Sequence, residues 1–93
     1  MKVLSKLPGE PWKETDIPNE LKALQDFVGG YIETVTVTAD MVIICNEEGR
    51  IHGLPYCCSL LGEDFVGPVI LAGVDGEEFT DCPQREFLVK LLK

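Results

Sequence analysis

The sequence predicts a single α+β domain over residues 1–93, in which a mostly antiparallel sheet of about four to six strands carries two helices on one face. Two segments space their apolar residues by three and four, as amphipathic helices do, and the segments between them alternate or run apolar as strands do. Hydrophobic residues make up 45% of the chain and charged residues 26%, which is the balance of a globular protein. The predicted order is β-β-α-β-β-β-β-α.

The chain begins with a predicted hairpin. Residues 2–7 and 11–17 have extended character, and Pro8 and Gly9 lie between them. Proline fixes φ at one position of a tight turn, and glycine accepts a positive φ at the next.

The first helix is expected over residues 19–28. Its apolar stripe consists of Leu21, Leu24, Phe27 and Val28. Asn19 is the expected N-cap, because its side chain can accept a hydrogen bond from the first turn. Gly29 and Gly30 end the helix, since glycine adopts a left-handed conformation without strain.

Strands are expected in the middle of the chain. Residues 33–38 alternate valine and threonine, which indicates a strand with one solvated face, whereas residues 41–45 are apolar throughout and predict a central strand. Residues 66–74 predict a further strand, and Pro68 favours an edge position or a bulge there. The remaining expected segments are a brief strand at residues 50–52 and a loop at residues 53–64.

The second helix is expected over residues 80–93. Asp81 is its expected N-cap, and Lys90 and Lys93 suit the end of the helix that favours cations. The apolar side consists of Phe87, Leu88, Leu91 and Leu92.

Residues 44–58, ICNEEGRIHGLPYCC, hold the one histidine of the chain and three of its four cysteines. Asn46 at the first position and Gly49 at the fourth predict a tight turn that joins two strands of a hairpin. Side chains alternate along such strands, so Cys45 and His52 would share one sheet face as diagonal neighbours, roughly 7 to 8 Å apart.

Two chemical interpretations of this segment are open, a zinc site and a thiol nucleophile with a histidine base, and both draw on Cys45, His52, Cys57 and Cys58. Zinc needs four ligands in a tetrahedron, no Cys-x2-Cys pair is present, and adjacent cysteines point apart on an extended backbone. Apolar surroundings raise the pKa of a thiol. Core packing is therefore favoured, and we expect no catalytic, cofactor-binding or metal-binding residue.

The excess of acidic side chains indicates which class of molecule the protein binds. Sixteen acidic and eight basic side chains give a formal net charge of -8. Direct nucleic-acid binding is disfavoured, because that affinity comes largely from cations, and a protein partner with a basic surface is expected instead. The absence of a signal-peptide pattern and of a long apolar run favours a cytoplasmic protein with reduced cysteines.

The candidates for an interaction surface are Trp12, Tyr31, Glu47 and Glu48. Exposed aromatic residues contribute strongly to binding, and core packing is the alternative for both of them. Gly29, Gly30 and Gly49 are expected to have positive φ or to lie against neighbouring backbone. Free edges at the outer hairpin and at the strand with Pro68 would allow pairing in a homo-oligomer.

The order LKALQDFVGGYIETV, VIICNEEGRIHGLP and VGPVILAGVDGEEF resembles a family of short proteins of bacteria, phages and integrative elements that is known only as a domain of unknown function. The likeness extends from about Val3 to Phe79. The chain departs from the family pattern after Pro55, where an asparagine and a basic residue are expected in place of Cys57 and Cys58. The resemblance implies an accessory role on mobile elements, often among antirestriction and transfer genes, and it supplies no activity.

Composition, motifs and resemblance together predict a small acidic protein-interaction or regulatory module of a phage or mobile element, without enzymatic activity. Its carboxylates would imitate the charge of DNA toward a host defence enzyme. The alternatives are a zinc- or thiol-dependent enzyme and a structural subunit of a homo-oligomer.

Overall fold

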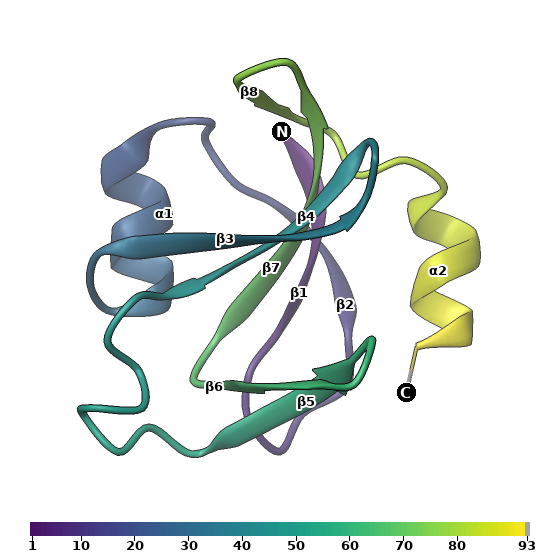
Figure 1. The fold of residues 1–93 in the computed structure, drawn as a ribbon. Helices are drawn as coiled ribbons and strands as arrows, with labels where there is room; N and C mark the ends of the chain where they lie inside the picture. The colour runs from purple at the N-terminus through teal and green to yellow at the C-terminus, as the bar shows by residue number, and fades with distance from the viewer. Residues whose placement is uncertain (93) are drawn as a thin grey trace.

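The computed structural model describes residues 1–92, whose elements follow the predicted order of two strands, a helix, a run of strands and a helix (Figure 1). The elements are β1 (Lys2–Lys6), β2 (Lys13–Asp16), α1 (Leu21–Val28), β3 (Ile32–Thr38), β4 (Met41–Asn46), β5 (Tyr56–Leu60), β6 (Glu63–Val66), β7 (Val69–Asp75), β8 (Glu78–Thr80) and α2 (Arg85–Leu91). The predicted α+β class is confirmed, and the run between the helices has six strands instead of four.

The strands form two antiparallel sheets. The larger sheet has the order β2-β1-β7-β4-β3, with β8 paired to β7, and the smaller sheet consists of β5 and β6. β4 and β7 are central strands of almost continuous apolar sequence, as strands covered on both faces are. The expectation that Pro68 marks an edge position or a bulge in its strand is wrong, because β7 is central and pairs with β1 and β4 without a register shift. Pro68 precedes β7, so its missing N–H does not interrupt the hydrogen bonds between β7 and its neighbours.

The larger sheet buries both of its faces, and the two helices contact opposite faces (Figure 1). On one face, Val42 and Ile44 of β4 pack with Leu24 of α1. On the other face, Ile43 packs with the smaller sheet and with Leu88 of α2. The expectation of both helices on one face is therefore wrong, because alternate apolar residues of β4 give each face a surface that needs a cover.

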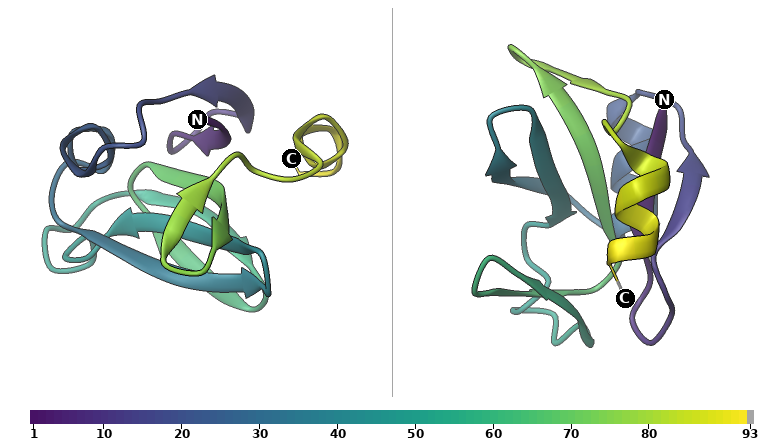
Figure 2. Two further views of the ribbon diagram at one scale, coloured as in Figure 1. Left: turned by 90° about the horizontal axis from the view of Figure 1, so that it is seen from above. Right: turned by 90° about the vertical axis from the view of Figure 1, so that its right-hand side faces the viewer.

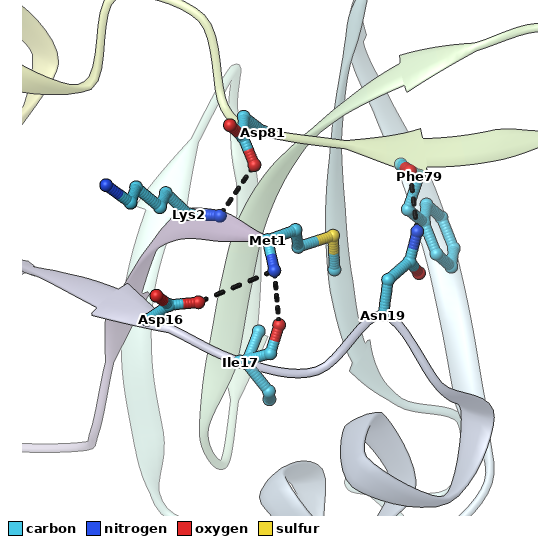
Figure 3. Close-up of polar contacts among 7 residues, drawn as sticks. All are labelled: Met1, Lys2, Asp16, Ile17, Asn19, Phe79 and Asp81. Carbon is cyan, nitrogen blue, oxygen red and sulfur yellow. Dashed lines mark hydrogen bonds and ion pairs between the residues drawn. The ribbon is translucent and has the colours of Figure 1, made fainter.

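β1 and β2 form the predicted hairpin. A backbone hydrogen bond of 3.0 Å closes the turn around Pro8 and Gly9, and Gly9 has a φ of 80°. At the open end of the hairpin, the amino group of Met1 donates to the Ile17 carbonyl over 2.7 Å and lies 3.5 Å from the Asp16 carboxylate (Figure 3). Both ends of this hairpin are thus held by short polar contacts.

The two predicted N-cap side chains connect the segments after β2 and β8 to neighbouring strands and do not cap helices (Figure 3). The Asn19 amide donates to the Phe79 carbonyl over 2.8 Å, and the Asp81 carboxylate accepts from the Lys2 N–H over 2.7 Å. Neither α1 nor α2 has a side-chain cap. Both cap predictions are therefore wrong, because each helix begins later than predicted, with Glu20 and Gln84 at the two N-cap positions.

The second helix is shorter than predicted. Gln84 has a φ of 56°, so the backbone becomes helical only after it. Phe87 and Leu91 are exposed, and the residues of this segment that pack on the core are Leu88, Val89 and Leu92. Lys90 lies in the last turn as predicted, and Lys93 lies outside the described residues. Both helices of residues 1–92 fall short of the length and hydropathy of a membrane span.

Candidate functional site

The chain after β4 does not return as a strand. The predicted turn from Asn46 to Gly49 forms, with a backbone hydrogen bond of 3.3 Å, but the following residues continue as successive turns. β4 already has β3 on one side and β7 on the other, so no edge is left for a returning strand. The predicted strand at residues 50–52 is wrong, and so is the placement of Cys45 and His52 as neighbours on one sheet face.

Asn46 fixes the start of this segment by holding the end of α1. Its amide nitrogen donates to the Val28 carbonyl over 3.1 Å, and its amide oxygen accepts from the Glu48 N–H over 2.8 Å. Gly29 ends α1 with a φ of 82°, as predicted. Gly30 lacks a positive φ, but a Cβ there would come within 3.0 Å of the Asn46 amide, so side-chain packing is what requires the glycine.

A cleft of about 240 Å³ lies between β3 and β6, and we call it the acidic cleft. Its carboxylates are Glu33 on β3, Glu47 in the turn, and Glu63 and Asp64 on β6. Its apolar lining residues are Val35, Cys45, Phe65 and Val66. Gly49 also borders the cleft. It was expected to have a positive φ or to lie against neighbouring backbone, and its φ is not positive. A Cβ there would lie 2.9 Å from Val66 Cγ2, so close packing excludes a side chain.

Negative charge dominates the acidic cleft. Arg50 is the one basic residue on its lining in the described part of the chain, and its guanidinium donates to the Asp64 carbonyl over 2.7 Å. Burial, together with the Glu33 and Glu63 carboxylates, raises the pKa of the Cys45 thiol to about 11. Carboxylates from two strands therefore act on one point at the base of the cleft, where a cation would be favoured.

A second hollow, the thiol cavity, has a volume of about 460 Å³ and is lined by Lys6, Trp12, Cys57, Cys58, Leu60 and Leu92, among others. The smaller sheet lies at the end of the molecule at which α2 ends (Figure 2). β5 carries a bulge between Tyr56 and Cys58, with Cys57 as the extra residue. The bulge interrupts the alternation of side chains, so both adjacent thiols are buried in one core cluster. The predicted loop at residues 53–64 is wrong, because Tyr56–Leu60 is a strand, and the expectation that adjacent cysteines point apart on an extended backbone fails at this bulge.

Lys6 of β1 joins the larger sheet to the thiol cavity. Its ammonium donates to the Cys57 carbonyl over 2.7 Å, and the Cys57 thiol donates to the Lys6 carbonyl over 3.5 Å. A hydrogen bond from the Cys58 thiol lowers the pKa of Cys57, and Lys6 lowers it further against the opposite effect of burial. The same hydrogen bond, together with burial, raises the pKa of Cys58.

The other candidates lie apart from these thiols. His52 is exposed and borders a hollow at the end of α1, together with Glu48 and Tyr31. Tyr31 is 66% exposed, whereas Trp12 is 5% exposed, so the core-packing interpretation holds for Trp12. Within residues 1–92, no three side chains of His, Cys, Asp or Glu are placed to hold one metal ion. The structure thus separates His52 from the cysteines with which it was grouped.

The model of a family described as a domain of unknown function (DUF3846) matches residues 1–93. The chain belongs to this family. The resemblance to a family known only as a domain of unknown function is thereby confirmed, and the family description assigns no activity. No curated protein and no solved structure was found to match the chain. Functional assignment for this DUF3846 domain therefore rests on its acidic cleft and its thiol cavity.

Sequence reasoning missed Lys6 in this DUF3846 domain. A signal was present, because Leu4 and Lys6 are two residues apart on β1 and side chains two apart share a face. Leu4 is fully buried on the face that packs against the smaller sheet, so the same alternation turns Lys6 toward that sheet. A lysine at such a position is a strong indication of a polar partner inside the protein.

Proposed function

We propose that this domain is a non-enzymatic interaction module that binds a basic segment of another protein in the acidic cleft. The observation that carries the proposal is the convergence of carboxylates from β3, β6 and the turn after β4 on one cleft with apolar lining. A Lys or Arg side chain suits such a cleft, because its alkyl part covers apolar surface while its charge meets the carboxylates.

The free edge of β3 gives the partner a backbone with which to pair. In the described sheet β3 pairs with β4 alone, and its residues Glu33 and Val35 line the acidic cleft. An extended segment added to this edge would place alternate side chains over the cleft. Ile51 is 80% exposed at the rim and offers an apolar contact. The proposed partner segment is therefore extended, with basic and apolar residues in alternation.

DNA-binding surfaces are one source of such segments, since their Lys and Arg side chains are placed to meet phosphates. Carboxylates in the acidic cleft would occupy those cations and exclude DNA. An anti-defence or regulatory role on a phage or mobile element would use the cleft in this way. Because the sequence resembles a family found on such elements, a DNA-binding protein is the first partner to test. The same negative charge disfavours direct binding of nucleic acid by the domain itself.

The test compares two double variants of equal charge. Glu33→Gln with Glu63→Gln removes charge inside the cleft, and Glu10→Gln with Glu77→Gln removes the same charge from exposed positions outside it. In pull-downs from host lysate, we expect a partner that the wild type and the control retain and the cleft variant loses, with elution by moderate salt. Zero-length carbodiimide crosslinks should join Glu33 or Glu63 to lysines of that partner.

Equal capture by both double variants would contradict the proposal. Crosslinks that join only copies of this chain to one another would replace it with the homo-oligomer alternative. Such pairing would use β3 or the outer strand β2, because the strand after Pro68 is central and has no free edge there.

A further inference from the structure

We propose that the thiol cavity binds a small organic anion, namely a monocarboxylate with a short apolar tail, through the ammonium of Lys6. The cavity has a volume of about 460 Å³, which lies within the roughly 300 to 1,000 Å³ of small-molecule sites. Its lining combines one buried cation with apolar side chains, as such a ligand requires. The proposal uses none of the residues of the acidic cleft, so its test is independent of the docking proposal.

The first observation is the uncompensated charge of Lys6. The residue is 8% exposed, and within residues 1–92 no carboxylate forms an ion pair with it. Its ammonium donates to the Cys57 carbonyl over 2.7 Å, which uses one of three N–H groups and leaves two for other acceptors. Because a carbonyl is neutral, this hydrogen bond does not compensate the charge. A buried cation is unfavourable without an anion beside it, and a bound carboxylate would be that anion.

The second observation is the difference between the bottom of the cavity and its mouth. Lys6 and Trp12 are almost fully buried, whereas Tyr56 and Leu91 are 58% and 61% exposed. The cation therefore lies at the bottom, and the mouth is formed by an aromatic and an aliphatic side chain. A ligand that enters with its carboxylate first would meet Lys6 and leave its tail between Trp12 and Leu91.

Apolar contacts with the tail add to the affinity. Leu60 and Leu92 are partly buried and also border the cavity. Each methylene group of a ligand that is buried against such side chains strengthens binding roughly fourfold. The charge and the tail should therefore contribute separately, and ligands that lack one or the other should bind more weakly.

The experiment follows the fluorescence of Trp12, which is the one tryptophan of the chain and lines the cavity. The native protein is titrated with sodium hexanoate, sodium butyrate and 1-hexanol at pH 7 and constant ionic strength. We expect a saturable change with hexanoate. Butyrate should bind roughly tenfold more weakly because it lacks two methylene groups, and 1-hexanol roughly tenfold more weakly because it lacks the charge.

Two lysine variants test the role of the cation. Lys6→Met replaces the ammonium by an apolar side chain of similar length, so it should weaken hexanoate binding roughly tenfold or more and leave 1-hexanol binding unchanged. Lys13→Met removes an exposed lysine of β2 that does not line the cavity, and it should leave the binding of both ligands unchanged.

Equal dissociation constants of the native protein for hexanoate and 1-hexanol would overturn the inference, and so would the absence of a saturable change with hexanoate. Equal binding of hexanoate by Lys6→Met and Lys13→Met would also overturn it. If Lys6→Met does not fold, the comparison of the three ligands in the native protein still decides the outcome.

Discussion

The acidic cleft and the thiol cavity border the same two-stranded sheet, yet they hold cysteines of opposite character. Cys45 and Cys57 are both buried in one core cluster. Near Cys45 lie the Glu33 and Glu63 carboxylates, and its pKa is raised to about 11. Near Cys57 lie Lys6 and a donating thiol, and its pKa is lowered. Burial raises the pKa of both thiols and is the largest cause at Cys45, so the opposite direction at Cys57 comes from the Cys58 thiol and Lys6 beside it.

The largest expected effect is on stability in alkali. The folded protein holds Cys45 protonated to about pH 11, whereas an ordinary thiol of the unfolded chain ionises near 9.0. Between these values the unfolded state binds fewer protons, so stability falls as pH rises, by roughly 2 to 3 kcal/mol for this thiol. Cys45→Ala should flatten that decline in urea denaturation under reducing conditions. An unchanged decline would show that Cys45 ionises equally in both states.

Cys82 provides a matched control for this prediction. Its pKa is also raised to about 11, with burial as the largest cause, while Arg85 lowers it and Asp40 raises it. Cys82→Ala should therefore flatten the alkaline decline to a similar degree. A much smaller effect than that of Cys45→Ala would mean that the carboxylates of the cleft outweigh burial.

The packing of the acidic cleft can be broken at Gly49. A Cβ at this position would lie 2.9 Å from Val66 Cγ2. Because overpacking destabilises a core, Gly49→Val should destabilise the fold by about 2 kcal/mol. Ile51→Val, at an exposed neighbouring position, should change stability by less than about 0.5 kcal/mol. Thermal melting of both variants checks this difference. An unchanged melting temperature for Gly49→Val would contradict the tight contact between β6 and the turn.

A gain in stability is expected at the turn between β5 and β6. Leu61 has a φ of 53° and Gly62 a φ of 76°, a two-residue turn in which leucine is strained. Leu61 is 75% exposed, so its side chain contributes little burial. Leu61→Asn should stabilise the protein by about 1 kcal/mol, whereas Leu61→Val should destabilise it, because β-branched residues avoid positive φ. Urea denaturation that ranks the two variants in the opposite order would contradict the turn geometry.

The smallest expected effect on stability is that of Lys6→Met. A buried ammonium without a carboxylate partner is replaced by an apolar side chain of similar length, so stability should stay within about 1 kcal/mol of the wild type. Denaturation by urea measures this change. A loss as large as that expected for Gly49→Val would show that the hydrogen bond from Lys6 to the Cys57 carbonyl stabilises the fold by more than the buried charge destabilises it.

Turn residues and hydrophobic periodicity correctly predicted the turns, strands and helix that depend on short-range interactions. The Pro8 turn, the helix that ends at Gly29 and the two strands on either side of Asp40 all follow from turn chemistry and periodicity. The hairpin of β5 and β6 was missed, because Leu61 replaces the Asn or Asp that normally marks such a turn. The strand predicted at residues 50–52 does not form, because β3 and β7 already pair with both edges of β4, and sequence patterns do not show that long-range pairing.

The sites depend still more on tertiary structure. Glu47 was named as an interaction candidate and does lie on the acidic cleft, but Glu33 and Glu63 come from strands far apart in the sequence and meet only in the fold. The shared orientation of Cys57 and Cys58 depends on a bulge that a sequence pattern does not reveal. Lys6 was the one site residue whose inward position alternation alone could have shown.

The opposite pKa shifts of Cys45 and Cys57 are tested most directly by the pH dependence of iodoacetamide labelling at these two thiols. Each rate is followed by mass spectrometry and normalised to its own plateau, which removes the difference in access. We predict a half-maximal rate below pH 9.0, the ordinary thiol value, for Cys57 and near pH 11 for Cys45. Coincident profiles, or ionisation of Cys45 before Cys57, would contradict the opposite fields assigned to the two sites.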